Sequence, residues 1–127
     1  MNRELRDDIR SVDQVAAELV DATDAELDER IRSLELLRRQ VDAELALTVS
    51  MAEQRQVFLA DGHRSMKGYL RATCNWSNAD IAAQRRLASA ADQVPGLADA
   101  LHRGRIGTAQ AAAIARVHRN PRVRVRL

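Results

Sequence analysis

The sequence predicts an all-α fold: an irregular bundle of five or six helices, with one long helix at about residues 24–57 followed by three to four short ones. Three observations predict it. Apolar residues recur at steps of three and four, which is the spacing of one face of a helix. Alanine, leucine and arginine, which favour helices, dominate, whereas aromatic residues make up only 2% of the chain. No glycine or proline interrupts the chain before Gly62.

The length and the terminal segments define the expected domain. A chain of 127 residues predicts one helical domain over residues 1–127, with a core that needs no disulfide or metal. The charged N-terminus lacks the apolar segment of a signal peptide, and no apolar run approaches the roughly 20 residues of a membrane helix. We therefore expect a cytoplasmic protein with no membrane partner. Residues 122–127 alternate like a strand without a partner strand, so we expect the domain to be truncated at its C-terminal end.

The long helix is predicted from its cap and its apolar repeat. Before it, residues 11–20 form a short amphipathic segment. Thr23, followed three residues later by Glu26, has the pattern of a capping box that begins a helix. The apolar stripe of this helix then comprises Leu27, Ile31, Leu34, Leu37, Val41, Leu45, Thr48 and Ala52. At 1.5 Å per residue the helix is about 50 Å long, whereas a compact domain of this size has a radius of gyration near 14 Å.

A helix of this length needs something to cover its apolar surface. Four further residues beside the stripe widen that surface, namely Leu36, Ala43, Leu47 and Met51. An antiparallel helix pairing or a homodimer would bury it, with a candidate interface formed by Leu27, Ile31, Leu34, Leu37, Val41 and Leu45. The alternative is that the helix breaks near residues 48–52 and folds back.

Turn and capping residues delimit the first two short helices. Asp61 and Gly62 form a turn signal, and residues 65–73 after it are predicted to be helical. Ser77, with an acid three residues later at Asp80, predicts the start of a helix at residues 78–92. The residues of this helix expected to point inward are Ile81, Leu87, Ala88 and Ala91.

Two more helices are expected near the C-terminus. Pro95 suits the first turn of a helix at residues 95–103, and Gly104 suits its end. Thr108 is expected to cap a last helix at residues 109–119, which the Asn120-Pro121 pair ends.

The charges of the two parts of the chain are opposite. Residues 1–54 hold 14 acidic and 7 basic residues, a net charge of −7, whereas residues 55–127 hold 4 acidic and 13 basic residues, a net charge of +9. This asymmetry is compatible with a basic half that faces nucleic acid. It is equally compatible with two halves that attract each other within one fold or within a dimer.

The last three predicted helices have the short connections of a helix-turn-helix array, which favours double-stranded DNA as a partner. The candidate DNA-binding residues are Arg85, Arg86, Arg103, Arg105, Gln110, Arg116 and Arg119, and Arg122, Arg124 and Arg126 of the tail could also contact phosphates. The alternative is a purely structural role, because any small helical bundle contains such turns. The alanines at positions 109 and 111–113 favour close helix packing as much as a DNA-reading surface.

Residue patterns for catalysis and cofactor binding are missing from the sequence. His63, His102 and His118 are scattered, and none forms a metal-ligand spacing with a cysteine or a carboxylate. Cys74 is the single cysteine and is interpreted as a structural thiol. There is no glycine-rich phosphate loop and no nucleophile motif. We therefore predict no catalytic site, no metal, no cofactor and no small-molecule ligand.

The segment from Asp61 to Arg122 resembles a known family. The shared features are the Gly62 to Tyr69-Leu70 stretch, Arg86-Leu87-Ala88, Val94-Pro95, Ala100-Leu101 and Gly104-Arg105-Ile106, preceded by a long acidic helix. This ordered pattern, covering about residues 10–125, resembles the actinobacterial 13E12 repeat family.

The resemblance implies a limited function. The matching region is the family's N-terminal helical domain, which is of unknown function and precedes an HNH endonuclease domain in longer members. That nuclease domain is missing here, so no catalytic residue carries over to this chain. The implied function is a non-catalytic, DNA-associated accessory module. The alternatives are a protein-interaction or homodimerisation module that does not bind DNA, and a non-functional truncated repeat copy.

Overall fold

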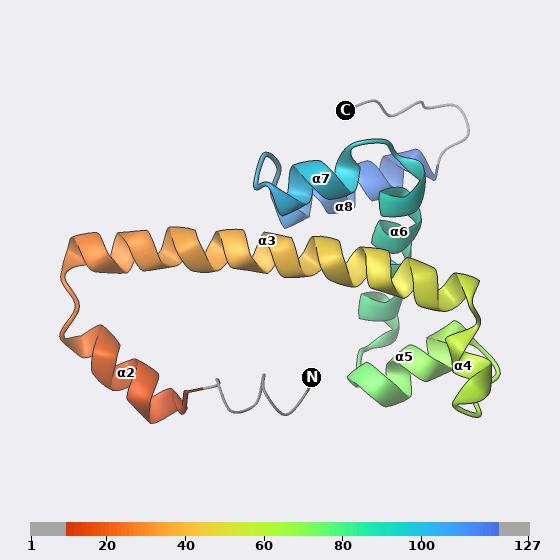
Figure 1. Cartoon of the computed structure of the whole chain (residues 1–127), viewed down its shortest axis with the longest axis horizontal. Coiled ribbons are helices and arrows are strands. Elements are labelled where there is room, and N and C mark those ends of the chain that lie inside the picture. The colour runs from red at the N-terminus through yellow and green to blue at the C-terminus, as the bar shows by residue number, and fades with distance from the viewer. Residues whose placement is uncertain (1–9, 120–127) are drawn as a thin grey trace. The chain divides into compact units, whose positions relative to one another are not determined.

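The computed structural model describes residues 10–119 and is all-α there, as predicted: helices occupy most of these residues, and no strand occurs among them. The helices are α2 (Val12–Val20), α3 (Asp24–Gln54), α4 (Val57–Ala60), α5 (Met66–Cys74), α6 (Asn78–Gln93), α7 (Leu97–His102) and α8 (Thr108–His118) (Figure 1). None of these helices is both long and apolar enough to cross a membrane.

The chain divides into two compact units, one ending at Glu35 and the other beginning at Leu36. The boundary falls within α3, so each unit takes part of this helix.

In the N-terminal unit, side-chain caps begin both α2 and α3. The Ser11 hydroxyl accepts a hydrogen bond from the Gln14 backbone N (3.1 Å), and the Gln14 side chain accepts one from the Ser11 backbone N (2.9 Å), which begins α2. The predicted capping box of α3 is confirmed, with Glu26 N to Thr23 Oγ1 at 3.1 Å and Thr23 N to Glu26 Oε1 at 3.2 Å. The pKa of Glu26 is lowered mainly by the hydrogen bond from the Thr23 backbone and, second, by a hydrogen bond with the Thr23 side chain.

The long helix is continuous as far as Gln54, so the alternative of a break near residues 48–52 is wrong. It ends three residues before the predicted position, because Gln56 adopts a left-handed backbone conformation with φ 55°. A left-handed residue cannot continue a right-handed helix. Residues Val57–Ala60 therefore form a separate short helix, α4, which the sequence had not indicated.

The side of α3 that faces the core differs from its predicted apolar stripe. Its buried residues are Ala43, Ala46 and Val49. Among the stripe residues, Leu27 and Leu45 are half-buried, whereas Ile31, Leu34, Leu37 and Val41 are exposed. Small side chains occupy the buried side because they allow the neighbouring helices of the C-terminal unit to approach α3 closely.

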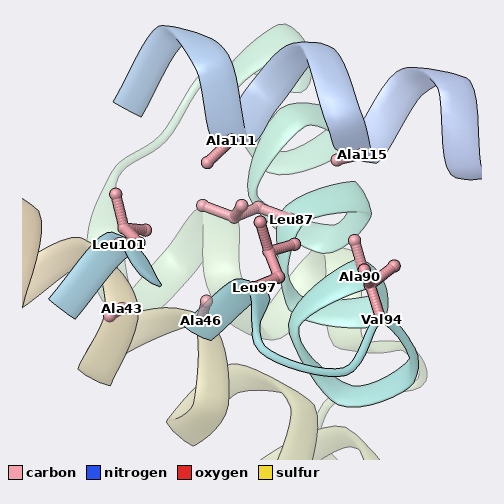
Figure 2. Close-up of a cluster of buried hydrophobic side chains, with 9 residues drawn as sticks. All are labelled: Ala43, Ala46, Leu87, Ala90, Val94, Leu97, Leu101, Ala111 and Ala115. Carbon is pink, nitrogen blue, oxygen red and sulfur yellow. The ribbon is translucent and has the colours of Figure 1, made fainter. Parts of the chain in front are cut away.

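Two clusters of buried side chains form the core of the C-terminal unit. The first joins α3, α6, α7 and α8, and Figure 2 shows Leu87 and Leu97 between the alanines of α8 and those of α3. The second contains Val49, Met66, Leu70, Ile81 and Ala88. Phe58, Tyr69 and Trp76, which are all the aromatic residues of the chain, pack against the second cluster.

Several predictions for α5 and α6 are confirmed. Three of the four residues expected to point inward from α6, Ile81, Leu87 and Ala88, are buried, and Ala91 is half-buried. Cys74 is a half-buried free thiol against the second cluster, as expected of a structural cysteine.

The connection between α6 and α7 corrects one boundary. Helix α7 begins at Leu97 rather than at Pro95, because Gly96 precedes it in a left-handed conformation with φ +84°. Gly104 ends α7 as predicted, with φ +76°. A Cβ atom at this position would lie 2.8 Å from Leu36 Cδ1, so the end of the Leu36 side chain would have to move, whereas the positive φ is what favours glycine here.

The start of α8 corrects another prediction. The cap residue is Gly107 and not Thr108, whose hydroxyl instead donates a hydrogen bond to Asp42 Oδ2 of α3 at 2.7 Å. Arg39, one turn earlier on α3, donates from Nη1 to the Gly104 carbonyl at 2.9 Å. Two polar side chains of α3, Arg39 and Asp42, therefore hold the α7–α8 connection. The Thr108 hydroxyl does not cap α8 because it is hydrogen-bonded to Asp42.

The N-cap of α6 gives a first testable prediction. The Ser77 hydroxyl accepts a hydrogen bond from Asp80 N at 3.1 Å, so it satisfies one of the unpaired NH groups of the first turn. We expect Ser77→Ala to lower the free energy of unfolding by about 1 kcal/mol. Urea denaturation followed by circular dichroism measures the change. Ser77→Asp is the matched control, because aspartate is also a good N-cap, and it should retain most of the stability.

Candidate nucleic-acid interface

A basic hollow of about 580 Å³ opens on the C-terminal unit. It lies along α6 and also receives side chains from α3, from α5 and from the residue that follows α8. Its lining consists of Glu53, Lys67, Asn78, Ile81, Ala82, Arg85, Arg86, Ser89 and Arg119. We refer to these residues as the basic hollow.

The spacing of residues on α6 explains the shape of this site. Asn78, Ala82, Arg85 and Ser89 follow one another at steps of four, three and four, so they lie on one face of the helix. Ala82 and Ser89 have small side chains, which leave space beside the long arginine between them. Ile81, at the inner edge of this face, is 2% exposed and belongs to the second core cluster, so α6 is held rigidly behind the hollow.

Four cationic side chains and one carboxylate line the basic hollow. The carboxylate of Glu53 forms an ion pair with Arg85, so this arginine is partly neutralised. Within residues 10–119, no ion pair involves Lys67, Arg86 or Arg119. Three cations therefore converge without a described counter-charge, which is a chemical environment that favours an anion.

Arg71 lies beside this site, since its guanidinium donates a hydrogen bond to the side chain of Asn78 in the lining. Arg71 is exposed and adds a fifth positive charge near the edge of the hollow.

Arg103 and Arg105, which the sequence placed in the same candidate site, lie elsewhere. Both form ion pairs with Asp99 of α7, the first with Nε 2.9 Å from Asp99 Oδ1. The hydrogen bond from Arg103 is the main cause of a lowered pKa at Asp99, opposed by desolvation and supported by the charges of both arginines. The carboxylate offsets part of their positive charge, so these two arginines are less available to phosphate than Arg86 and Arg119.

The two candidate residues on α8 have different surroundings. The Gln110 side-chain oxygen accepts a hydrogen bond from Gly107 N at 2.8 Å, so it serves the start of the helix. Arg116 is exposed on α8 and forms no ion pair among the residues that the structure describes. Ala111 and Ala115 of the same helix pack on α6 in the first core cluster. The tail residues Arg122, Arg124 and Arg126 lie outside the described residues.

The structure thus brings together Arg85, Arg86 and Arg119 of the seven candidates and adds residues that sequence reasoning missed. Asn78 and Ser89 could have been found from their helical spacing with Arg85. No comparable signal existed for Lys67 or Glu53, which reach the site from α5 and from the end of α3. Their place depends on how three helices pack.

The histidines and the cysteine lie apart from this site. His63 Nε2 is 3.5 Å from Asp61 Oδ2, and its ring stacks edge-on against Tyr69 with a centroid distance of 5.9 Å. His118 Nε2 is hydrogen-bonded to the Gln93 side-chain oxygen at 2.8 Å. In the part of the chain that the structure describes, no three histidine, cysteine or acidic side chains are grouped so that they could hold a metal ion.

Comparison with protein-family models, with curated proteins and with solved structures finds no match for this chain.

Proposed function

We propose that this chain is a non-catalytic helical module that binds double-stranded DNA through its phosphate backbone, with the basic hollow as the contact surface. The observation that carries the proposal is the convergence of Lys67, Arg86 and Arg119 on one hollow that contains a single carboxylate. The resemblance to the 13E12 repeat family supports an accessory role beside a DNA-cleaving domain. In an actinobacterial cell such a module would act in the cytoplasm, where the chromosome lies.

The chemistry of the lining suits a phosphate group. A guanidinium presents its NH donors in a planar fork that matches two phosphate oxygens, and an ammonium binds phosphate as a point charge. Asn78 and Ser89 add neutral polar groups between these cations. Helix α6 fixes the backbone positions of the donors that it carries, Arg85, Arg86, Asn78 and Ser89, which lowers the entropic cost of association.

The same arrangement favours backbone contacts over the reading of bases. Base readout needs several polar side chains that project together from one helix into the major groove. On α8, the acceptor oxygen of Gln110 is engaged by Gly107 N, and Ala111 and Ala115 are buried. We therefore expect weak sequence preference and a strong dependence on salt.

The decisive experiment is a titration of a labelled duplex with the full chain, followed by fluorescence anisotropy at several salt concentrations between about 50 and about 200 mM. Three unpaired cations predict a slope of log affinity against log salt near −3, at about −0.9 for each phosphate neutralised. We expect Arg86→Ala with Arg119→Ala to reduce the magnitude of this slope by about 2 and to weaken binding to unrelated duplexes equally.

The matched control is Arg103→Ala with Arg105→Ala, which removes the same formal charge from a site where Asp99 already offsets it. This control should change the slope by less than half as much as Arg86→Ala with Arg119→Ala does. Equal losses in both double variants would mean that net charge alone drives binding, and the basic hollow would then not be the site. An absence of binding at the lowest salt concentration would contradict the proposed function itself.

Replacement of Glu53 is expected to raise duplex affinity, whereas replacement of the arginines lowers it. Its carboxylate is the counter-charge of Arg85 within the basic hollow. We expect Glu53→Gln to release Arg85 for phosphate and to raise duplex affinity roughly threefold to tenfold at low salt, with the slope steeper by about 1. The anisotropy titration measures both quantities. Unchanged affinity would show that the phosphate backbone does not approach this end of the hollow.

A further inference from the structure

The basic hollow continues into a smaller hollow of about 240 Å³ between α3 and α6. Glu53 and Ser89 line both hollows, so the two form one continuous groove. The other described residues of the smaller hollow are polar or small, and none of them is cationic: Ser50, Gln54, Ala88, Asp92 and Gln93. We refer to the smaller hollow as the acidic end of the groove.

The charge of this groove changes sign along α6. Arg71, which is hydrogen-bonded to Asn78 at the start of α6, extends the positive charge of the basic hollow in one direction. In the other direction, Asp92 follows Ser89 by about one turn of helix and is exposed. No ion pair of the described part of the chain involves Asp92, and Glu53 adds a second carboxylate at the same end. The groove is therefore positive at one end and negative at the other.

This change of sign matters for a DNA strand, because every internal phosphate has a neighbouring phosphate on either side. A phosphodiester bound in the basic hollow, with its strand along the groove, would bring one of these neighbours toward Asp92 and Glu53. Like charges repel there, which opposes the passage of a continuous strand. A phosphate that ends a strand has a neighbour on one side only, and the strand then follows the positive part of the groove.

The origin of the three unpaired cations also favours a strand end. Lys67 comes from α5, Arg86 from α6 and Arg119 from the residue after α8, so they gather at one volume instead of forming a row. A row of cations suits successive phosphodiesters, each with a single negative charge. A phosphomonoester concentrates about −1.5 to −2 charges and three free oxygens in one group at pH 7. Three converging cations match that group better than they match a single phosphodiester.

We propose that the basic hollow binds the phosphomonoester at the end of a DNA strand in preference to the phosphodiesters within the strand. This preference rests on the proposed function and narrows it to duplex ends. The guanidinium forks of Arg86 and Arg119 bind pairs of phosphate oxygens, and the ammonium group of Lys67 binds as a point charge. The Asn78 amide oxygen accepts a hydrogen bond from Arg71, so its NH2 group remains as a donor for the phosphate.

Fluorescence anisotropy of one short duplex, labelled at an internal base and prepared with different ends, tests the proposal at about 50 mM salt. The ends carry a 5′-phosphate, a 3′-phosphate or hydroxyl groups only, and a fourth form is closed by hairpin loops. We expect the full chain to bind a phosphorylated form roughly tenfold more tightly than the hydroxyl form, since the terminal group adds charge and free acceptor oxygens. The closed form should bind like the hydroxyl form, and the two phosphorylated forms show which strand end fits.

The arginines of the hollow should account for this tenfold ratio of affinities. Arg86→Ala with Arg119→Ala should bring the ratio close to one, because both guanidinium forks are lost. Arg103→Ala with Arg105→Ala is the matched control and should keep the ratio, because these residues pair with Asp99 outside the hollow. If circular dichroism shows a loss of helix in the first variant, Arg86→Gln with Arg119→Gln replaces it, because glutamine favours helices.

Replacement of Asp92 tests the acidic end of the groove. Asp92→Asn should raise the affinity for the closed duplex roughly threefold, because a continuous strand is then repelled less. The ratio between the phosphorylated and the closed form should fall accordingly. Asp61→Asn removes the same charge from another exposed residue, outside the lining of the groove, and should leave this ratio unchanged.

The outcomes separate this preference from the proposed function. Equal affinity for all four forms of the duplex would overturn the preference for strand ends and leave binding to the phosphate backbone intact. A tenfold ratio that persists in Arg86→Ala with Arg119→Ala would place the terminal phosphate outside the basic hollow and overturn the proposal as well. A chain that binds none of the four forms at the lowest salt concentration would contradict both the preference and the proposed function.

Discussion

Leu101→Ala is expected to lower the free energy of unfolding by about 3 kcal/mol. Leu101 is 1% exposed and is one of the largest fully buried side chains of the C-terminal unit. It belongs to the cluster that joins α7 to α3, α6 and α8, where Figure 2 shows it beside Ala43 and Ala111. These alanines are too small to fill the space that the truncation leaves, so a cavity remains and its cost adds to the lost transfer energy.

Urea denaturation followed by circular dichroism measures this loss. Leu59→Ala makes the same truncation on α4, where the leucine side chain is 55% exposed, and should change stability by no more than about 0.5 kcal/mol. Similar losses in both variants would contradict the conclusion that Leu101 is packed in a core that cannot close around the cavity. A loss of less than about 1 kcal/mol for Leu101→Ala would contradict this conclusion as well.

Ala115→Leu is expected to destabilise the chain by about 1–3 kcal/mol through overpacking. Ala115 is 2% exposed and lies with Ala111 where α8 packs against Leu87 and Ala90 of α6. Ala111 and Ala115 of α8 and Ala90 of α6 allow these two helix backbones to approach closely there. Three additional carbon atoms at this position require α8 to move away from α6.

This substitution also links packing to the proposed function. Arg119 follows α8 directly and lines the basic hollow together with Arg85 and Arg86 of α6. A displaced α8 moves Arg119 away from the other cations, so we expect duplex affinity to fall as well as stability. Ala113→Leu is the matched control, because Ala113 is exposed on the same helix and its replacement should leave both quantities nearly unchanged. Equal effects of the two substitutions would contradict the close α6–α8 packing.

Local signals explain the predictions that the structure confirms. The capping pairs Thr23–Glu26 and Ser77–Asp80 each lie within one turn of helix, so their geometry depends on neighbours in the sequence alone. Gly104 ends α7 for a similarly local reason, since glycine adopts a positive φ at little cost. The burial of Ile81, Leu87 and Ala88 followed from their helical spacing.

Competition from distant groups explains the predictions that were wrong or incomplete. Thr108 has the side chain of a good N-cap, but its hydroxyl is bonded to Asp42, 66 residues away in the sequence. The boundary between α3 and α4 depends on the left-handed conformation of Gln56, a residue type that rarely adopts it. The nearby sequence indicates neither the Thr108–Asp42 hydrogen bond nor the left-handed conformation of Gln56.

The sequence by itself determined the fold class, the start of the long helix and the ends of most short helices, because caps, turns and helical periodicity act over a few residues. It also determined the net positive charge of residues 55–127. Only the tertiary structure decided which of those charges converge. It placed Lys67, Arg86 and Arg119 in one hollow. It also turned Ala43 and Ala46 of α3 into the core and left Leu37 and Val41 exposed. The physical reason is that helix packing is governed by how closely side chains of given size allow backbones to approach, and this depends on residues far apart in the chain.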